Sequence, residues 1–522
     1  MSPPPNQPAA PDEVVADRHR RNVILACCSL SLFIVSLDAT VVNVGLPAIQ
    51  RDLHASVAGL QWTIDAYTLV IASLLLLSGS LGDRFGRRKL FQIGLVIFGI
   101  GSLACSLAPN LGSLIAFRML QAVGGSMLNP NSLSIITSVF TEPKERARAI
   151  GVWGGIFGIS AASGPIIGGL LIDTIGWRAL FWINIPVVVV ASYLAARTVP
   201  ESRAAKPRRL DPPGQLITIA LLSSLTFAII EGPDHGWTSP LIAGLFAVAA
   251  VSMIALVTVE RRRLEPLLEV RFFRSPPFSG AATIATLAFL ILAGFLFLNT
   301  LYLQEVRGDS ALMAGVSTLP ATIVIAVVAP LSGRMVAARG SRVPLTGAGV
   351  LLAGGALVLA ADRATSPYLL LAVGYLLLGL GFGLVNPPIT NTAVAGMPQS
   401  QSGVAAAVAS TSRQTGNVLG VALVGSLVTT RFHRLLAPRL APFHLPAATH
   451  AALLHSGIGA TGLHLPGGAG GALAAAVDSA FTVASHAGWY LAAGCGIAIS
   501  LVAAVTTGPK ARAAAARVMR EA

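Results

Sequence analysis

Apolar residues fill long stretches of this chain, and short polar stretches separate them. Each apolar stretch holds roughly 20 residues, the length that an α-helix needs to cross about 30 Å of hydrocarbon. The pattern predicts an all-α polytopic membrane protein. We expect fourteen spans, at residues 23–46, 60–79, 89–107, 112–136, 149–171, 180–196, 214–231, 240–259, 278–300, 313–333, 344–361, 367–388, 403–428 and 484–506.

Positively charged residues give the expected orientation of these spans. An even number of spans places both termini on one side, and most of the 36 Lys and Arg lie on that side, in alternate connections. Cytoplasmic loops carry such an excess, so we expect both termini in the cytoplasm and the spans in a bacterial inner membrane. The net charge of +14 is spread over these loops. This distribution argues against a nucleic-acid partner, and the lipid bilayer is the expected environment.

An internal repeat predicts how the spans are grouped. Residues 124–130 (GGSMLNP) resemble residues 381–387 (GFGLVNP) at an offset of 257 positions. Two related six-helix halves with two extra central spans, 214–231 and 240–259, explain this offset, and such a repeat places a binding site at the midplane between halves. The expected organisation is a tail (1–22), a six-helix bundle (23–196), a linker with the extra spans (197–277), a second bundle with a long external loop at 429–483 (278–506), and a tail (507–522).

Three charged residues lie within the predicted spans and are candidates for proton coupling: Asp38, Asp65 and Arg118. A charge in hydrocarbon is costly, so each is expected to have a function. A buried carboxylate favours its neutral form, so its protonation can follow changes in access from either side. The structural alternative is that each aspartate caps or hydrogen-bonds a neighbouring helix. For Asp65, nearer the external surface, interfacial water is a further alternative.

Polar and aromatic side chains within the spans are candidates for the wall of a central cavity. Arg118, Gln121 and Asn129 recur at helical spacing, and lipid cannot satisfy such a polar stripe. The cavity candidates are Asn43, Gln121, Asn129, Phe157, Phe295, Phe382 and Arg413. Five histidines lie in the loop 429–483, but their irregular spacing favours a partly ordered polar loop over a metal site. We expect no metal and no cofactor.

Two glycine-containing stretches are expected to control helix contacts. Residues 79–89 (GSLGDRFGRRK) form a tight turn between two spans, with glycines for conformational freedom and an acid that can accept from arginines. This loop is a candidate conformational latch, through Gly79, Gly82, Asp83, Arg84, Gly86, Arg87 and Arg88. The span 149–171 carries small residues at four-residue spacing and a bend at Pro165, which permit close helix approach.

Together these stretches resemble the major facilitator superfamily, specifically its fourteen-helix drug/proton antiporters. Residues 79–89 resemble the cytoplasmic-loop signature, and residues 37–47 (LDATVVNVGLP) resemble the first-helix signature of that branch. Arg118 with Gln121 is similar to the fourth-helix signature, whose arginine the family associates with proton coupling. The stretch with Gly164, Pro165, Gly168 and Gly169 resembles the antiporter signature of the fifth helix. Residues 177–186 and 412–416 resemble further stretches of the family.

The resemblance implies a secondary transporter and no enzyme. We expect a functional monomer that exchanges protons for a cationic or amphipathic drug-like molecule by alternating access, driven by the proton gradient. Spans 278–300, 313–333 and 367–388 contain no acid, so coupling is expected to rest on the N-terminal half. An uptake symporter for a small metabolite is the first alternative, and a membrane-embedded enzyme is a weaker one.

Overall fold

Long α-helices make up nearly all of the computed structural model, which describes residues 11–204, 210–263, 270–363, 365–395, 397, 402–443, 445 and 470–521. Within these residues there is no strand. The helices before the linker are α1 (Pro11–Leu53), α2 (Val57–Phe85), α3 (Arg87–Ser106), α4 (Leu111–Val139), α5 (Pro143–Thr174), α6 (Ala179–Trp182) and α7 (Asn184–Thr198).

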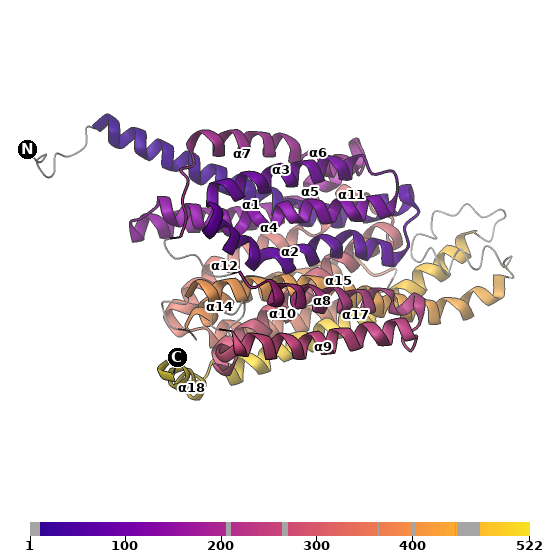
Figure 1. The fold of residues 1–522 in the computed structure, drawn as a ribbon. Coiled ribbons are helices and arrows are strands. Elements are labelled where there is room, and N and C mark those ends of the chain that lie inside the picture. The colour runs from indigo at the N-terminus through magenta and orange to yellow at the C-terminus, as the bar shows by residue number, and fades with distance from the viewer. Residues whose placement is uncertain are drawn as a thin grey trace, which may run out of the picture.

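The remaining helices form a hairpin and a second group. The hairpin consists of α8 (Pro212–His235) and α9 (Pro240–Arg262). After a 3-10 turn at Val270–Arg274 come α10 (Pro276–Leu301) with the π-helical turn η2 (Tyr302–Val306), α11 (Ala311–Ser317), α12 (Leu319–Arg339), α13 (Arg342–Leu359), α14 (Tyr368–Ala395), α15 (Ser402–Leu440), α17 (Gly470–Thr506) and α18 (Pro509–Glu521). Figure 1 shows α1–α7 as one group and α10, α14, α15 and α17 in the other, with α11 beside α5 of the first group.

Every predicted span coincides with one of these helices or with two adjacent ones. Thirteen helical stretches among the described residues are long and apolar enough to cross a membrane. The long helix α15 is not among them, because Arg413, Gln414 and Asn417 lower the mean hydropathy of its first half. The helices also exceed the predicted ends: α15 and α17 both extend into the predicted loop 429–483, where Ala and Leu favour helix.

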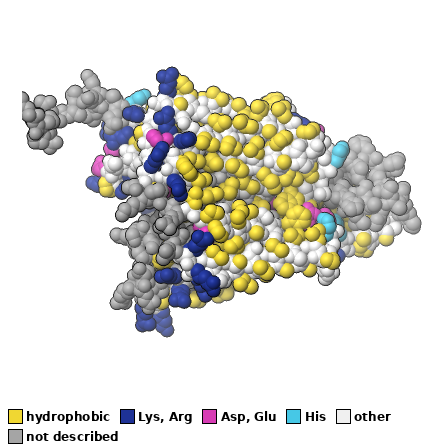
Figure 2. Space-filling view, in the orientation of Figure 1, with side chains coloured by type: hydrophobic (Ala, Val, Ile, Leu, Met, Phe, Trp, Pro, Cys, Tyr) yellow, Lys and Arg dark blue, Asp and Glu magenta, His cyan; other side chains and the backbone are white. Residues whose placement is uncertain are grey.

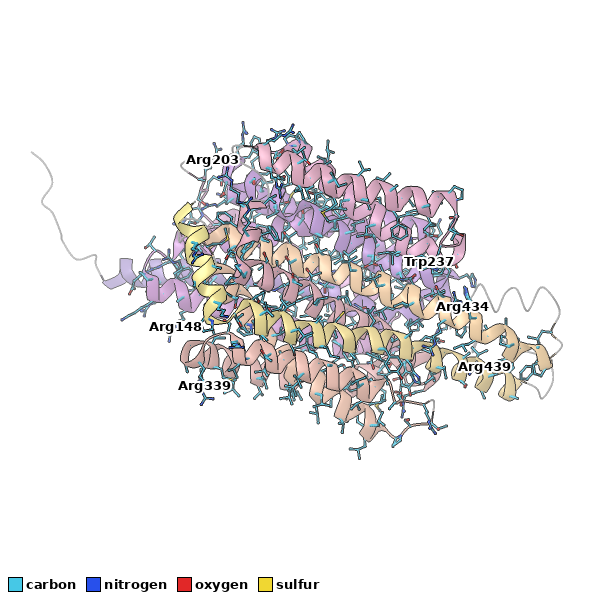
Figure 3. All side chains as sticks on the ribbon, turned by 90° about the horizontal axis from the view of Figure 1, so that it is seen from below. Arg148, Arg203, Trp237, Arg339, Arg434 and Arg439 are labelled. Atoms are coloured by element: carbon cyan, nitrogen blue, oxygen red, sulfur yellow. The ribbon has the colours of Figure 1, made fainter. Side chains whose placement is uncertain are left out.

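The two ends of the bundle differ in charge. In Figure 2 a broad hydrophobic band lies between the ends, and Lys and Arg gather mainly at one of them. We call this the basic end; α2 and α3 meet there at Gly86, and the opposite end is called the far end. Figure 3 shows Arg148, Arg203 and Arg339 at the basic end, and Trp237, Arg434 and Arg439 at the far end. This arrangement is typical of a membrane protein whose hydrophobic band contacts lipid.

The two halves contact each other closely toward the far end. The Gln304 side chain of η2 donates to the Val44 carbonyl of α1 at 2.9 Å, and the Leu312 amide of α11 donates to Asp173 of α5 at 3.1 Å. A Cβ added to Gly169 of α5 would lie 2.5 Å from the Leu312 Cα. The α5–α11 contact therefore depends on the missing side chain of Gly169.

The same face of α5 is open toward the basic end. Gly151 and Gly158 lie five and about three helical turns before Gly169, so all three share one face. An added Cβ on Gly151 or Gly158 would have no atom within 4 Å, and the same holds for Gly154 and Gly155. The conformation is thus closed between the halves at the far end and leaves α5 unpacked near the basic end.

The hairpin helix α8 covers the seam where α2 of one half meets α15 of the other. Its contacts with α2 are polar at both ends: the Trp62 indole donates to Glu231 at 2.8 Å, and Gln215 donates to the Ser73 carbonyl at 2.5 Å. Its contacts with α15 are apolar, with Leu222 beside Val418 and Ile230 beside Ala422. The two extra helices therefore join both halves from the side.

Gly169→Ala is expected to shift the protein away from this conformation, because the new methyl group would overlap the backbone of α11. Spin labels at Leu107 and Leu369, both exposed near the far end, report the separation of the halves there. We expect a longer-distance population in Gly169→Ala. Gly158→Ala is the matched control on the same face, since its methyl group meets open space. Identical distance distributions in the two variants would contradict the assignment of the closed contact.

Candidate functional site

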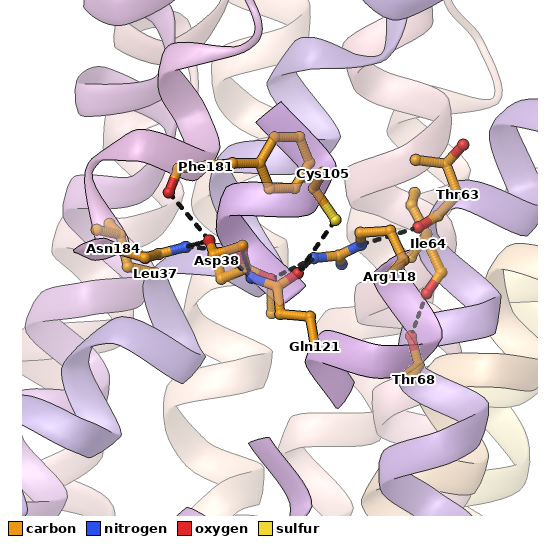
Figure 4. A network of polar contacts seen from close by, with 12 residues as sticks. Leu37, Asp38, Thr63, Ile64, Thr68, Cys105, Arg118, Gln121, Phe181 and Asn184 are labelled. Atoms are coloured by element: carbon orange, nitrogen blue, oxygen red, sulfur yellow. Dashed lines mark hydrogen bonds and ion pairs between the residues drawn. The ribbon is translucent and has the colours of Figure 1, made fainter. Parts of the chain in front are cut away.

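A buried ion pair lies at the centre of the N-terminal half. Asp38 of α1 and Arg118 of α4 are 0% and 1% exposed, and Arg118 Nη1 lies 2.5 Å from Asp38 Oδ2. The sequence brings them together because α4 packs against both α1 and α2 through small residues, among them Gly125 beside Tyr67. Figure 4 shows the network around this pair.

Neutral donors complete the shell of the Asp38 carboxylate. Its Oδ1 accepts from the side-chain amides of Gln121 at 2.8 Å and Asn184 at 3.1 Å. Asn184 begins α7, so the carboxylate joins three helices. Arg118, Gln121 and Asn184 together provide hydrogen-bond donors to both oxygens of this carboxylate.

The Arg118 guanidinium is held from its other sides by α2. Its Nε donates to the Thr63 carbonyl at 3.2 Å, and its carbon lies 4.0 Å from the centre of the Tyr67 ring. Nη1 also donates to Gln121 Oε1 at 2.7 Å. A cation–π contact and a carbonyl acceptor together replace water for the part of the guanidinium that Asp38 does not reach.

Ser102 of α3 links the network to its surroundings. Its hydroxyl donates to the Phe181 carbonyl at 2.9 Å and accepts from Asn184 at 2.9 Å and Gln121 at 3.2 Å. The sequence reasoning did not identify Ser102, Asn184 or Tyr67 as site residues. The one available signal was an amide side chain, Asn184, within an otherwise apolar stretch.

Asp65 of α2 is placed apart from this network. The residue is fully buried, and neither carboxylate oxygen has a hydrogen-bond partner among the described residues. Its side chain is enclosed by protein on all sides. A carboxylate enclosed in this way is stable only in its neutral form, because burying an unpaired charge is costly.

The loop between α2 and α3 makes its contacts within the first half and with the segment that follows α7. Asp83 accepts two hydrogen bonds from Arg87, at 3.0 and 2.8 Å. The backbone amides of Arg88 and Lys89 donate to the Glu201 carboxylate, each at 3.2 Å. Glu201, which the sequence reasoning missed, thus caps the N-terminus of α3. Gly86 has a φ of +119°, which favours glycine at this turn.

The glycines of α5 let it approach two other helices. An added Cβ on Gly164 would overlap the Thr40 side chain of α1, and one on Gly168 would lie 3.3 Å from Val41. Gly169 serves the contact with α11 described above. Pro165 lies inside α5, and its carbonyl would be 2.3 Å from a Cβ on Gly315 of α11.

The cavity candidates do not line one common wall. Gln121 belongs to the ion-pair network, whereas Asn43 borders a small pocket between the halves with Thr40, Pro165 and Asn299. Phe295 packs on Tyr375 and Trp489 within the second half, at ring-centre distances of 5.6 and 6.2 Å. Phe382 is buried, Asn129 is partly buried and Arg413 contacts Thr390; the Phe157 side chain lies outside the described residues.

Asp38→Asn is expected to destabilise the protein by about 3 kcal/mol, because it leaves the Arg118 charge buried without an anion. Adding Arg118→Gln removes that charge, so the double variant should recover part of the loss. Thermal unfolding of the purified protein in detergent measures both effects. Asp52→Asn is the control. Asp52 lies on the same helix as Asp38 and forms an exposed ion pair with Arg178, so this variant should change stability by less than about 1 kcal/mol. Additive single and double effects would mean that the pair is not coupled.

A family model for the Major Facilitator Superfamily matches residues 28–421. The chain is 37% identical to the multidrug resistance protein Stp of Mycobacterium tuberculosis, over 80% of this chain and 77% of that protein. It is 34% identical to the tetracenomycin C resistance and export protein of Streptomyces glaucescens, over 81% and 78% of the two chains. With the methylenomycin A resistance protein of Streptomyces coelicolor the identity is 35%, over 77% and 85%.

Solved structures share the fold at low identity. A bacterial homologue of the human lysosomal transporter Spinster superposes with a TM-score of 0.66 at 18% identity, covering 96% of this chain and 98% of that one. A D-xylose-proton symporter superposes with a TM-score of 0.58 at 16% identity, covering 84% and 95%. With two helical halves and a family match over most of its length, the chain belongs to the major facilitator superfamily, and its relatives include multidrug and antibiotic resistance proteins.

Proposed function

We propose that this transporter is a proton-coupled antiporter that exports amphipathic drug-like small molecules from a bacterial cytoplasm by alternating access. In this proposal it lies in the inner membrane as a functional monomer, with the basic end and both termini in the cytoplasm, and needs no cofactor. The observation that carries the proposal is the fully buried Asp38–Arg118 pair inside one half of a two-half carrier. Ionisable groups at such depth serve transport far more often than stability.

The described conformation corresponds to an inward-facing carrier that has released its proton. The far end is closed through Gly169 and Gly315, and α5 is open toward the basic end. In this conformation Asp38 carries its charge, because Arg118, Gln121 and Asn184 all donate to it. Protonation from the far end would remove that charge and weaken its bonds to all three donors. The packing of α1 against α4 and α7 would then favour the other conformation, in which substrate leaves.

Asp65 is proposed as a second proton site. It lies on α2, the helix that also supplies Thr63 and Tyr67 to Arg118. Its unpartnered carboxylate favours the protonated state in this conformation. Movement of α2 against α15 during the cycle would expose it to water and release the proton.

The second half lacks an equivalent pair, which supports coupling through the first half. The repeat offset of 257 relates Asp38 to Phe295 and Arg118 to Tyr375. These two rings pack with centres 5.6 Å apart, so an aromatic contact occupies the position of the ion pair. Proton-dependent rearrangement is therefore assigned to one half, while the other provides a fixed apolar partner.

The relatives support drug-like substrates. The relatives are named for multidrug resistance, for tetracenomycin C resistance and export, and for methylenomycin A resistance. An uptake symporter with the same fold remains an outcome of the transport test, since the fold is shared with a D-xylose-proton symporter.

Transport into energised everted vesicles tests the proposal. We expect the parent protein to accumulate a fluorescent dye and to release protons as it does so, and Asp38→Asn to abolish both while dye binding persists. Asp52→Asn is the control on the same helix and should transport normally, because that pair is exposed. Accumulation that survives collapse of the proton gradient, or that persists in Asp38→Asn, would refute the mechanism. Dye movement in the opposite direction would indicate uptake.

Asp65→Asn should leave stability within about 0.5 kcal/mol of the parent, because an amide resembles the neutral carboxyl that burial favours. If Asp65 carries a proton, the number of protons released per dye molecule falls in this variant while transport continues. The measurement is a pH-sensitive dye together with substrate uptake in the same vesicles. A strong loss of stability would instead show that Asp65 is ionised and paired.

A further inference from the structure

Arg413 of α15 is a cation in the second half that has no anionic partner among the described residues. Its Nη2 donates to the Thr390 hydroxyl of α14 at 2.6 Å, and its guanidinium carbon lies 5.8 Å from the centre of the Phe289 ring of α10. Its Nε is buried and has no hydrogen-bond partner among the described residues. A hydroxyl and a ring face are neutral, so neither compensates the positive charge.

The second half offers no acid at the depth of Arg413. Helices α10, α12, α13, α14 and α15 contain neither Asp nor Glu. The acids of this half are Glu305, Asp309, Asp362 and Asp478, which lie in turns or helix ends near the far end. Arg413 follows the start of α15 by eleven residues, or about 16 Å along the helix from the basic end. That distance places it near the middle of the membrane.

The acids of the first half are not available either. Both oxygens of Asp38 already accept hydrogen bonds within the first half, from Arg118 and two amides. Asp65 is fully enclosed. The charges near the midplane therefore consist of one balanced pair and one unbalanced guanidinium. An arginine in this environment requires an anion or water, because its charge persists under all conditions.

Arg413 lies on the helix of the second half that packs against α2 of the first half. The residue is only partly buried, and its helix borders α2 of the first half through Gln61, which donates to the Val421 and Ala422 carbonyls. The repeat offset relates Arg413 to Ile156 of α5, beside the unpacked Gly155 and Gly158. The pseudo-symmetric face at the same depth is thus the one that leaves room for a ligand.

We infer that Arg413 binds an acidic group, most simply a carboxylate, on the exported molecule. Thr390 accepts from one N–H of Nη2. The carboxylate accepts from the unpartnered Nε and from the second N–H of Nη2, the side-on pair that a guanidinium offers. Phe289 provides an apolar surface for the body of the molecule. This inference rests on the proposed export of amphipathic molecules and narrows their class: it favours acids and zwitterions over the simple cations expected from the sequence.

Equilibrium binding to the purified full-length protein in detergent tests this inference. Rhodamine B carries a free carboxylate, and its ethyl ester has the same ring system without it; fluorescence polarisation reports the binding of each. We expect the parent to bind the acid about tenfold more tightly than the ester. Arg413→Gln should weaken the binding of the acid by that factor and leave the binding of the ester unchanged. Arg413→Lys should retain part of the preference, and Thr390→Val should lose part of it.

Arg434→Gln is the matched control, since Arg434 is exposed near the end of the same helix. Equal affinity of the parent for acid and ester would overturn the inference. Equal weakening of the binding of both ligands in Arg413→Gln would also overturn it, because that result would indicate a structural role. If Arg413→Gln does not fold, the binding preferences of Arg413→Lys and Thr390→Val decide. Proton-driven transport of the ester in vesicles tests export independently, so failure of the subsite and failure of the proposed function give different results.

Discussion

The structure depends on one interaction, a buried ion pair in a medium that solvates neither charge. Asp38 and Arg118 come from different helices, and the groups that complete their hydrogen bonds come from α2, α3 and α7. Leaving either charge alone would cost several kcal/mol, so the positions of five helices are coupled to the protonation of one carboxylate. In the proposed mechanism, a single proton would therefore change the balance between two ways of packing this half.

The two halves have related helix arrangements but different side chains at equivalent positions. Where the first half has the ion pair, the second has Phe295 packed edge to face on Tyr375, whose hydroxyl donates to Asn299 at 2.5 Å. The only arginine within the second half's helices at midplane depth has no acid to pair with. One half thus holds the proposed proton site, and the other retains a positive charge. In the inferred cycle, proton and substrate act on opposite halves and communicate through the closed contact at Gly169.

Much of this organisation follows from the sequence. The apolar stretches predict every span, including α15, whose hydropathy is low. They do not predict α18, which lies in the expected C-terminal tail. Asp38 and Arg118 stand out because charges are rare in hydrocarbon. Asn184, Ser102 and Tyr67 do not, since helices tolerate neutral polar residues almost anywhere and only tertiary packing shows which ones meet. The open end is unpredictable for a different reason: both conformations of a carrier are encoded by the same residues, so no local pattern distinguishes them.

The contacts of α8 have a mechanical consequence. Hydrogen bonds at Trp62 and Gln215 fix this helix to α2, so the hairpin must travel with the first half. Its contacts with α15 are aliphatic and lack directional bonds, so α15 slides along α8 at little cost. One flank of the carrier therefore stays covered while the halves rock, whereas the flank of α5 alternates between packed and bare. A molecule dissolved in the bilayer could therefore enter the carrier from the flank of α5 but not from the flank that α8 covers.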